Sequence, residues 1–236
     1  MTERMLSTML IGKNPMDDPK KIQRSVPLYQ QVYVILQQKI LRGEYRPGQV
    51  VAESLLAEDL GVSRTPIREA LRQLEKDGLV QVGRYEVTIS NPSREEFVEL
   101  YLCRAALEQL VAERSALNRS SSDIDAMAQA LEDAETAINE GNHAAVLQAN
   151  TRFHDYMVDS TRMARLSRLM TSIRGPIILV RQLVLFCGEH FERDILREHH
   201  ELLNSIRESN ASQSKDNMAR HMTNDIERGL ARFDSC

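Results

Sequence analysis

The apolar residues of this chain recur mostly at the spacing of helices. From residue 92 onward they return every three or four positions, and no segment alternates in the way typical of a strand. Six helices are predicted here, over residues 93–119, 123–140, 143–159, 164–186, 190–208 and 213–232. Helices without a sheet bury their apolar faces on one another, so this part of the chain is predicted to be an all-α bundle.

The first predicted helix covers residues 28–42. Its apolar side chains form one broad stripe, which we expect to be buried: Leu28, Val32, Ile35 and Ile40, widened by Val34 and Leu36. Gly43 follows directly, and Pro47-Gly48 predicts a turn, so the helix ends there.

A helix-turn-helix pattern comes next. A short helix over residues 53–60 is followed by Gly61, which allows a tight bend, and by Ser63, which is placed to cap a second helix. Residues 79–90 then alternate between apolar and polar and turn at Gly83-Arg84, which predicts a small β-hairpin. Helices in this order with a hairpin behind them favour a winged helix-turn-helix.

The break between the two parts is predicted at Asn91-Pro92. Ser93 and Glu96 form a capping box that opens the first long helix. The fold class is therefore predicted to be mostly α, with a winged helix-turn-helix before an all-helical domain. The predicted divisions are a flexible N-terminal extension, the DNA-binding domain and the helical effector domain, over residues 1–25, 26–91 and 92–236 respectively.

Composition narrows the setting. The chain has 236 residues, 42% hydrophobic and 27% charged, and no apolar run approaches the ~20 residues of a membrane span. The first residues lack the apolar core and cleavage site of a secretory signal. The three cysteines are widely spaced without a metal-type pairing, which suggests reduced thiols. We therefore expect a cytoplasmic protein with no membrane partner.

The net charge of −4 is unevenly distributed. Residues 24–90 carry nine Lys or Arg and eight Asp or Glu, whereas residues 91–236 carry 17 and 23. Attraction to phosphate depends on where the positive charges lie, so a nearly neutral DNA-binding part can bind if its arginines share one face. Weak affinity of a single copy favours a dimer.

The arginines of the second short helix do share a face. Arg64, Arg68 and Arg72 are spaced by four, whereas Ile67, Ala70, Leu71 and Leu74 lie on another side. Arginine can bind phosphate or the edge of guanine, and hydroxyls beside a helix N-terminus suit phosphate. The alternative is an ordinary amphipathic surface helix. The candidate DNA contacts are Ser63, Arg64, Thr65, Arg68 and Arg72, with Gly83 and Arg84 at the hairpin tip.

Four residues of the helical part are candidate metal ligands. Asn150 and His154 are four apart on one helix, and His199 and His221 lie on two later helices. Three imidazoles and one side-chain oxygen that converge inside a bundle would hold a divalent ion. Spacing alone leaves open that these are scattered surface or core histidines.

The segment LAEDLGVSRTPIREALRQLEKDGLV resembles the DNA-binding domain of GntR-type bacterial transcription regulators. The resemblance covers about residues 28–90 and implies a homodimer on a short palindromic DNA operator. It implies that Arg64, Thr65 and Arg68 are the principal DNA contacts, with Arg72 beside them. The chain departs from the family at Ser54, where some members carry a phosphate-binding arginine, and in a shortened wing.

The second half resembles the all-helical effector domain of the FadR subgroup, the FCD type, through FVELYLCRAALEQLVAERSA, NTRFH, REHHELLNSI and MARHM. The resemblance implies a divalent ion, zinc or nickel, at Asn150, His154, His199 and His221. Asn150 stands where Asp is commoner, so the site would carry +2 instead of +1. Metal affinity should then fall, and attraction for an anionic ligand should rise.

These patterns predict a regulator that responds to a small carboxylate bound at the metal with help from Arg104. For Arg104, an ion pair with Glu108 or another buried acid is the open alternative. Two other functions remain open at this point. One is a metal-dependent enzyme, with Glu198 or Glu201 as base, and the other is a sensor of the metal alone. Whether the effector releases or promotes DNA binding is also open.

Overall fold

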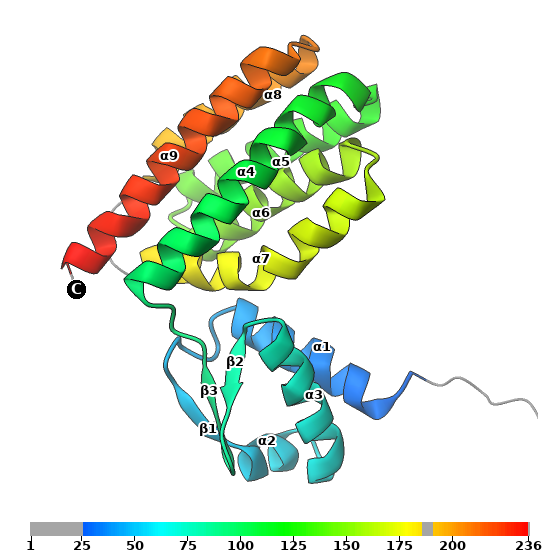
Figure 1. The fold of residues 1–236 in the computed structure, drawn as a ribbon, viewed down its shortest axis with the longest axis vertical. Coiled ribbons are helices and arrows are strands. Elements are labelled where there is room, and N and C mark those ends of the chain that lie inside the picture. The colour runs from blue at the N-terminus through cyan, green and yellow to red at the C-terminus, as the bar shows by residue number, and fades with distance from the viewer. Residues whose placement is uncertain (1–25, 186–190, 236) are drawn as a thin grey trace, which may run out of the picture.

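The computed structural model describes residues 26–185 and 191–235, so the predicted extension over residues 1–25 lies outside the described part. The fold class predicted from the sequence is confirmed. A small winged helix-turn-helix domain lies below a bundle of helices, and α7 is the bundle helix nearest to it (Figure 1).

The DNA-binding domain combines three helices with a three-stranded antiparallel sheet of order β1-β3-β2. Its elements are α1 (Leu28–Leu41), β1 (Val50–Ala52), α2 (Glu53–Asp59), α3 (Arg64–Lys76), β2 (Val80–Val82) and β3 (Glu86–Ile89). Strands β2 and β3 form the predicted hairpin, in which the Gly83 amide donates to the Glu86 carbonyl at 2.9 Å. Strand β1 was not predicted, and it pairs with β3.

Two sequence predictions about this domain need correction. In the stripe of α1, Val32, Leu36 and Ile40 are buried, but Leu28, Val34 and Ile35 are exposed. The core therefore takes a narrower face of α1, with one residue every fourth position, than the predicted stripe. Ser63 stands at the start of α3 as expected, but its side chain makes no capping hydrogen bond. The apolar face of α3 is buried as predicted.

The C-terminal domain is a bundle of six helices within the described residues. They are α4 (Arg94–Asn118), α5 (Ser121–Asn139), α6 (His143–Ser160), α7 (Ala164–Leu185), α8 (Glu192–Arg207) and α9 (Ala211–Ser235). Ser93 and Glu96 form the predicted capping box of α4, and a second box opens α5. Gly175-Pro176 lies inside α7 and does not end it. Phe97, Phe153 and Met157 are fully buried at the centre.

None of the helices formed by the described residues has both the length and the apolar character that crossing a lipid bilayer requires.

Candidate functional sites

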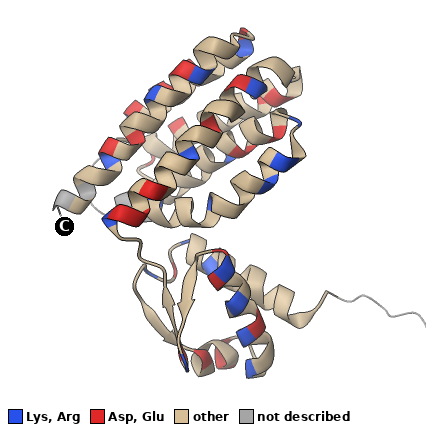
Figure 2. Ribbon diagram, in the orientation of Figure 1, with Lys and Arg blue, Asp and Glu red and all other residues tan. Residues whose placement is uncertain are grey.

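The recognition face of α3 is open to solvent. Arg64, Arg68 and Arg72 are exposed, and basic residues follow one another along this helix (Figure 2). Arg68 is oriented by a neighbour, because its Nε donates to Oε2 of Glu53 at 2.8 Å. Glu53 is buried at the start of α2, whereas about half of the Arg68 side chain stays exposed, and the bond to Glu53 engages only Nε. Thr65, at the first turn, is also exposed.

The wing lies beside this face. Gly83 and Arg84 are exposed at the tip, and the Arg84 guanidinium lies 5.2 Å from the centre of the Tyr85 ring. The Glu53 amide donates to the Tyr85 carbonyl at 3.2 Å, which joins the wing to α2. Glu53 therefore contacts both the recognition helix and the wing. It was not predicted, and only its place at the opening of the first short helix could have suggested it.

The three histidines predicted as metal ligands come together in the helical domain. His154, His199 and His221 extend from α6, α8 and α9, are all buried, and each offers a ring nitrogen within 4.8 Å of the others. The ring centres of His199 and His221 are 4.8 Å apart, and those of His154 and His199 are 5.1 Å apart. Asn150, one turn before His154, lines a small cavity of about 70 Å³ together with His199 and His221.

Several polar atoms of this cluster lack a hydrogen-bond partner in the described structure. They are Oδ1 of Asn150, both ring nitrogens of His199 and Nε2 of His221. Buried polar atoms are nearly always paired, so a group of converging atoms without partners needs an explanation. Imidazole nitrogens and an amide oxygen can bind zinc or nickel, and the donor set therefore fits a divalent ion.

The protonation of the cluster suits such an ion. Burial, together with His221 and His154, holds the pKa of His199 well below its ordinary value. Burial lowers the pKa of His154 to about 4, although Glu108 pulls it upward. Both rings are therefore neutral near pH 7, which is the form that coordinates metals.

A layer of charged groups surrounds the cluster. Nδ1 of His221 lies 2.7 Å from Oε2 of Glu198, whose other oxygen accepts from Asn224 and Arg228. A carboxylate on the far ring nitrogen fixes the tautomer and the orientation of a metal-binding imidazole. Sequence reasoning considered Glu198 only as a catalytic base, and in the structure both its oxygens are engaged in holding other side chains.

Arg104 lies beside the cluster and is fully buried. Its Nε donates to Glu108 at 3.3 Å and its Nη1 to Asp225 at 3.1 Å, so the alternative of a buried ion pair is present. Its Nη2 is 3.4 Å from Nε2 of His154. An anion held near His154 would therefore lie next to this guanidinium.

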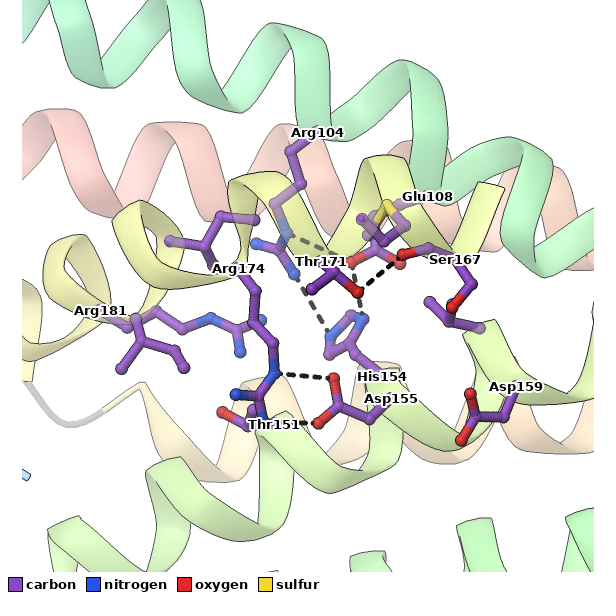
Figure 3. A pocket seen from close by; sticks show the side chains of 14 residues that line it. Arg104, Glu108, Thr151, His154, Asp155, Asp159, Ser167, Thr171, Arg174 and Arg181 are labelled. Carbon is purple, nitrogen blue, oxygen red and sulfur yellow. Dashed lines mark hydrogen bonds and ion pairs between the residues drawn. The ribbon is translucent and has the colours of Figure 1, made fainter. Parts of the chain in front are cut away.

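A cavity of about 360 Å³ opens on this side of His154. In Figure 3, Arg104 and Arg181 extend toward it from different helices, and Arg174 is paired with Asp155. Among the described residues, no carboxylate lies within ion-pairing distance of Arg181, and burial lowers its pKa. Arg181 was missed in the sequence, although a single charge within the apolar run around it was a usable signal.

Comparison with known proteins gives two family matches. Residues 28–86 match the model described as bacterial regulatory proteins, gntR family, and residues 99–224 match the model of the FCD domain. The chain is 32% identical over 212 residues to YdhC of Bacillus subtilis (strain 168), a protein described as an uncharacterized HTH-type transcriptional regulator. That match covers 89% of this chain and 94% of YdhC.

Two further likenesses extend over most of the chain. The HTH-type transcriptional regulator LutR of the same organism is 27% identical over 206 residues, which cover 78% of this chain and 93% of LutR. The structure of E. coli McbR/YncC is similar with a TM-score of 0.79 and 21% identity. It covers 89% of this chain and all of that one, and the likeness concerns the fold alone.

Proposed function

The chain belongs to the GntR family of bacterial transcription regulators and carries an FCD domain, and we propose from this that it binds DNA under the control of a ligand. We propose that this ligand is a small carboxylate. In this proposal a homodimer binds a palindromic operator through Arg64, Thr65, Arg68 and Arg72, with Ser63 and the wing residues Gly83 and Arg84 on phosphates. Its family and relatives are transcription regulators and not enzymes, so a metal-dependent hydrolase is not supported.

The observation that carries the effector part is the set of unpaired donors at the histidine cluster. We propose that Asn150, His154, His199 and His221 hold a zinc or nickel ion. When bound, the ion would supply a Lewis-acid position for one oxygen of an organic acid. Arg104, with a nitrogen 3.4 Å from His154, and Arg181, which lines the same cavity as Arg104, would bind the rest of that acid.

The charge at this site favours an anion. Imidazole and amide ligands bring no charge to a metal, so the full +2 charge of the ion would be uncompensated by its ligands. Glu108 and Asp225 contact the guanidinium of Arg104 at 3.3 and 3.1 Å, and they also lie 3.0 Å from His154 and 3.7 Å from His221, so Arg104 offsets part of their charge beside the ion. A cavity of about 360 Å³ is at the lower end of the range for small-molecule sites, which suits a small acid.

A dimer is proposed on two grounds. A single recognition helix reads only one half of a palindrome, so two copies are needed to cover it. The DNA-binding part also carries little net charge, so one copy would bind weakly without a second. Sedimentation of the free protein and of its complex with promoter DNA measures both states.

One titration tests the function as a whole. Fluorescence anisotropy of a labelled fragment from the protein's own promoter is measured with zinc alone, with small carboxylates alone and with both. The proposal expects the operator affinity to change only when metal and acid are present together. A change in operator affinity with zinc alone would favour the metal-sensor alternative. Turnover of an added acid would favour the alternative that the protein is a metal-dependent enzyme. An affinity that ignores every combination contradicts the proposed regulation.

Asn150→Asp tests the charge argument. A carboxylate ligand lowers the site charge by one, so we expect metal to bind about tenfold tighter, which corresponds to about 1.4 kcal/mol. Acids that bind with the metal should bind more weakly. Calorimetric titration measures both affinities, and Asn142→Asp is the matched control, since Asn142 caps the exposed start of α6 and Asp caps equally well. Equal metal affinity in both variants would remove Asn150 from the site.

A further inference from the structure

Helix α7 belongs to two hydrophobic surroundings at once. Leu179 of α7 is fully buried, and it belongs to the apolar core of the DNA-binding domain rather than to that of the bundle. Ile177 and Arg181 of the same helix line the cavity beside His154. Figure 1 shows α7 as the bundle layer that faces the DNA-binding domain.

The contact between α7 and the DNA-binding domain falls at the end of the recognition helix. A Cβ on Gly175 would lie 2.8 Å from a methyl carbon of Leu79, closer than real Cβ contacts come. A Cβ on Gly78 would lie 3.2 Å from the Pro176 ring. Gly175 and Pro176 therefore lie directly against Gly78 and Leu79, and a side chain at Gly175 would have to displace that of Leu79.

These two residues form the C-terminal cap of α3. Gly78 has a φ of 70°, and its amide donates to the Glu75 carbonyl at 3.0 Å. The amide of Leu79 donates to the carbonyl of Leu74 at 2.9 Å, so both bonds of a Schellman motif are present. A displacement of Leu79 must therefore move the last turn of α3 or break these bonds.

We propose that α7 is the mechanical link between the effector cavity and the recognition helix. Groups that enter the cavity push on the face of α7 that carries Ile177 and Arg181. The opposite face carries that displacement to Leu79, because Leu79 is fully buried against Gly175 and packed interiors do not deform continuously. Since α3 is a continuous helix, a shift of its C-terminal end also changes the orientation of Arg64 and Arg68 near its N-terminal end. This inference rests on the proposed effector cavity.

Hydrogen exchange of the full-length protein tests the link without DNA or ligand. The readout is the exchange of the Gly78 and Leu79 amides, with α5 as reference for global stability because it lies away from α7. Gly175→Ala should change exchange at these amides by at least about fivefold, the lower range of allosteric coupling. Adding Leu79→Val to it restores space and should bring exchange back. Ser172→Ala, exposed on the same helix, should leave it unchanged.

The cavity side is tested by Val158→Trp, which fills the cavity from α6. Its indole should change exchange at Gly78 and Leu79 as Gly175→Ala does, while α5 keeps its protection. In a Leu79→Ala background, which removes the side chain touching Gly175, this effect on the last turn of α3 should vanish. No response at α3 to Val158→Trp in the folded protein, or none to Gly175→Ala, overturns the inference. If the protein fails to bind promoter DNA, the proposed function is wrong. That outcome does not affect the exchange measurements, which test only the link through α7.

Discussion

Arg68→Ala is expected to weaken operator binding by about 1–3 kcal/mol and to relax base preference at one operator position. The reason is the restraint on this side chain. Its Nε is engaged by buried Glu53 at 2.8 Å, which restrains the guanidinium and leaves its two terminal nitrogens for the two bonds that arginine can make to guanine. Anisotropy with a set of single-base operator variants measures affinity and preference together.

The matched control is Lys76→Ala, which removes an exposed charge from the other end of α3. It should weaken binding slightly and equally for all sequences. If Arg68→Ala behaves in the same way and lowers the salt dependence of binding, then Arg68 holds phosphate rather than a base. Unchanged affinity and preference would move the recognition surface away from this face of α3. Glu53→Gln should reproduce the loss of preference in part, since the amide holds Nε less strongly than a carboxylate does.

The DNA-binding domain was predictable because its signals are local. The apolar residues of α3 recur at helical spacing within one helix, and Gly61 and Gly83 mark the turns on either side of it. Strand β1 escaped prediction because three residues carry no period, and they become a strand only through pairing with β3, more than thirty residues later. The buried stripe of α1 is narrower than predicted because its width is set by the elements packed on it, chiefly α3 and α7, which the periodicity of α1 itself does not reveal.

The candidate site divides in the same way. Glu108 could be named as a partner of Arg104 because it is four residues away on one helix. Asp225, which binds the same guanidinium, is 121 residues away, and nothing in the sequence connects the two. The family resemblance predicted that the histidines form one site. The positions of Glu198 and Arg181 beside them could not be predicted, because they depend on how α7, α8 and α9 pack together.

His199→Ala is expected to abolish stoichiometric metal binding. His199 is fully buried, and neither of its ring nitrogens has a hydrogen-bond partner among the described residues. Loss of a direct ligand should cost at least the roughly 10–100-fold that removal of an outer-shell partner costs. Metal analysis and calorimetric titration of the purified protein measure the loss. His200→Ala is the matched control, because His200 is adjacent on α8 but exposed.

Stability separates a ligand from a core histidine. If His199 is a ligand, zinc at about 100 times its dissociation constant should stabilise the wild-type protein by about 2.7 kcal/mol and the variant not at all. Without metal, His199→Ala removes two unpaired buried nitrogens along with the packing of the ring on Phe153, so these losses and gains offset one another. If the variant is destabilised by several kcal/mol in the absence of metal and still binds zinc when zinc is added, then His199 is a packing residue and the proposed metal site is wrong.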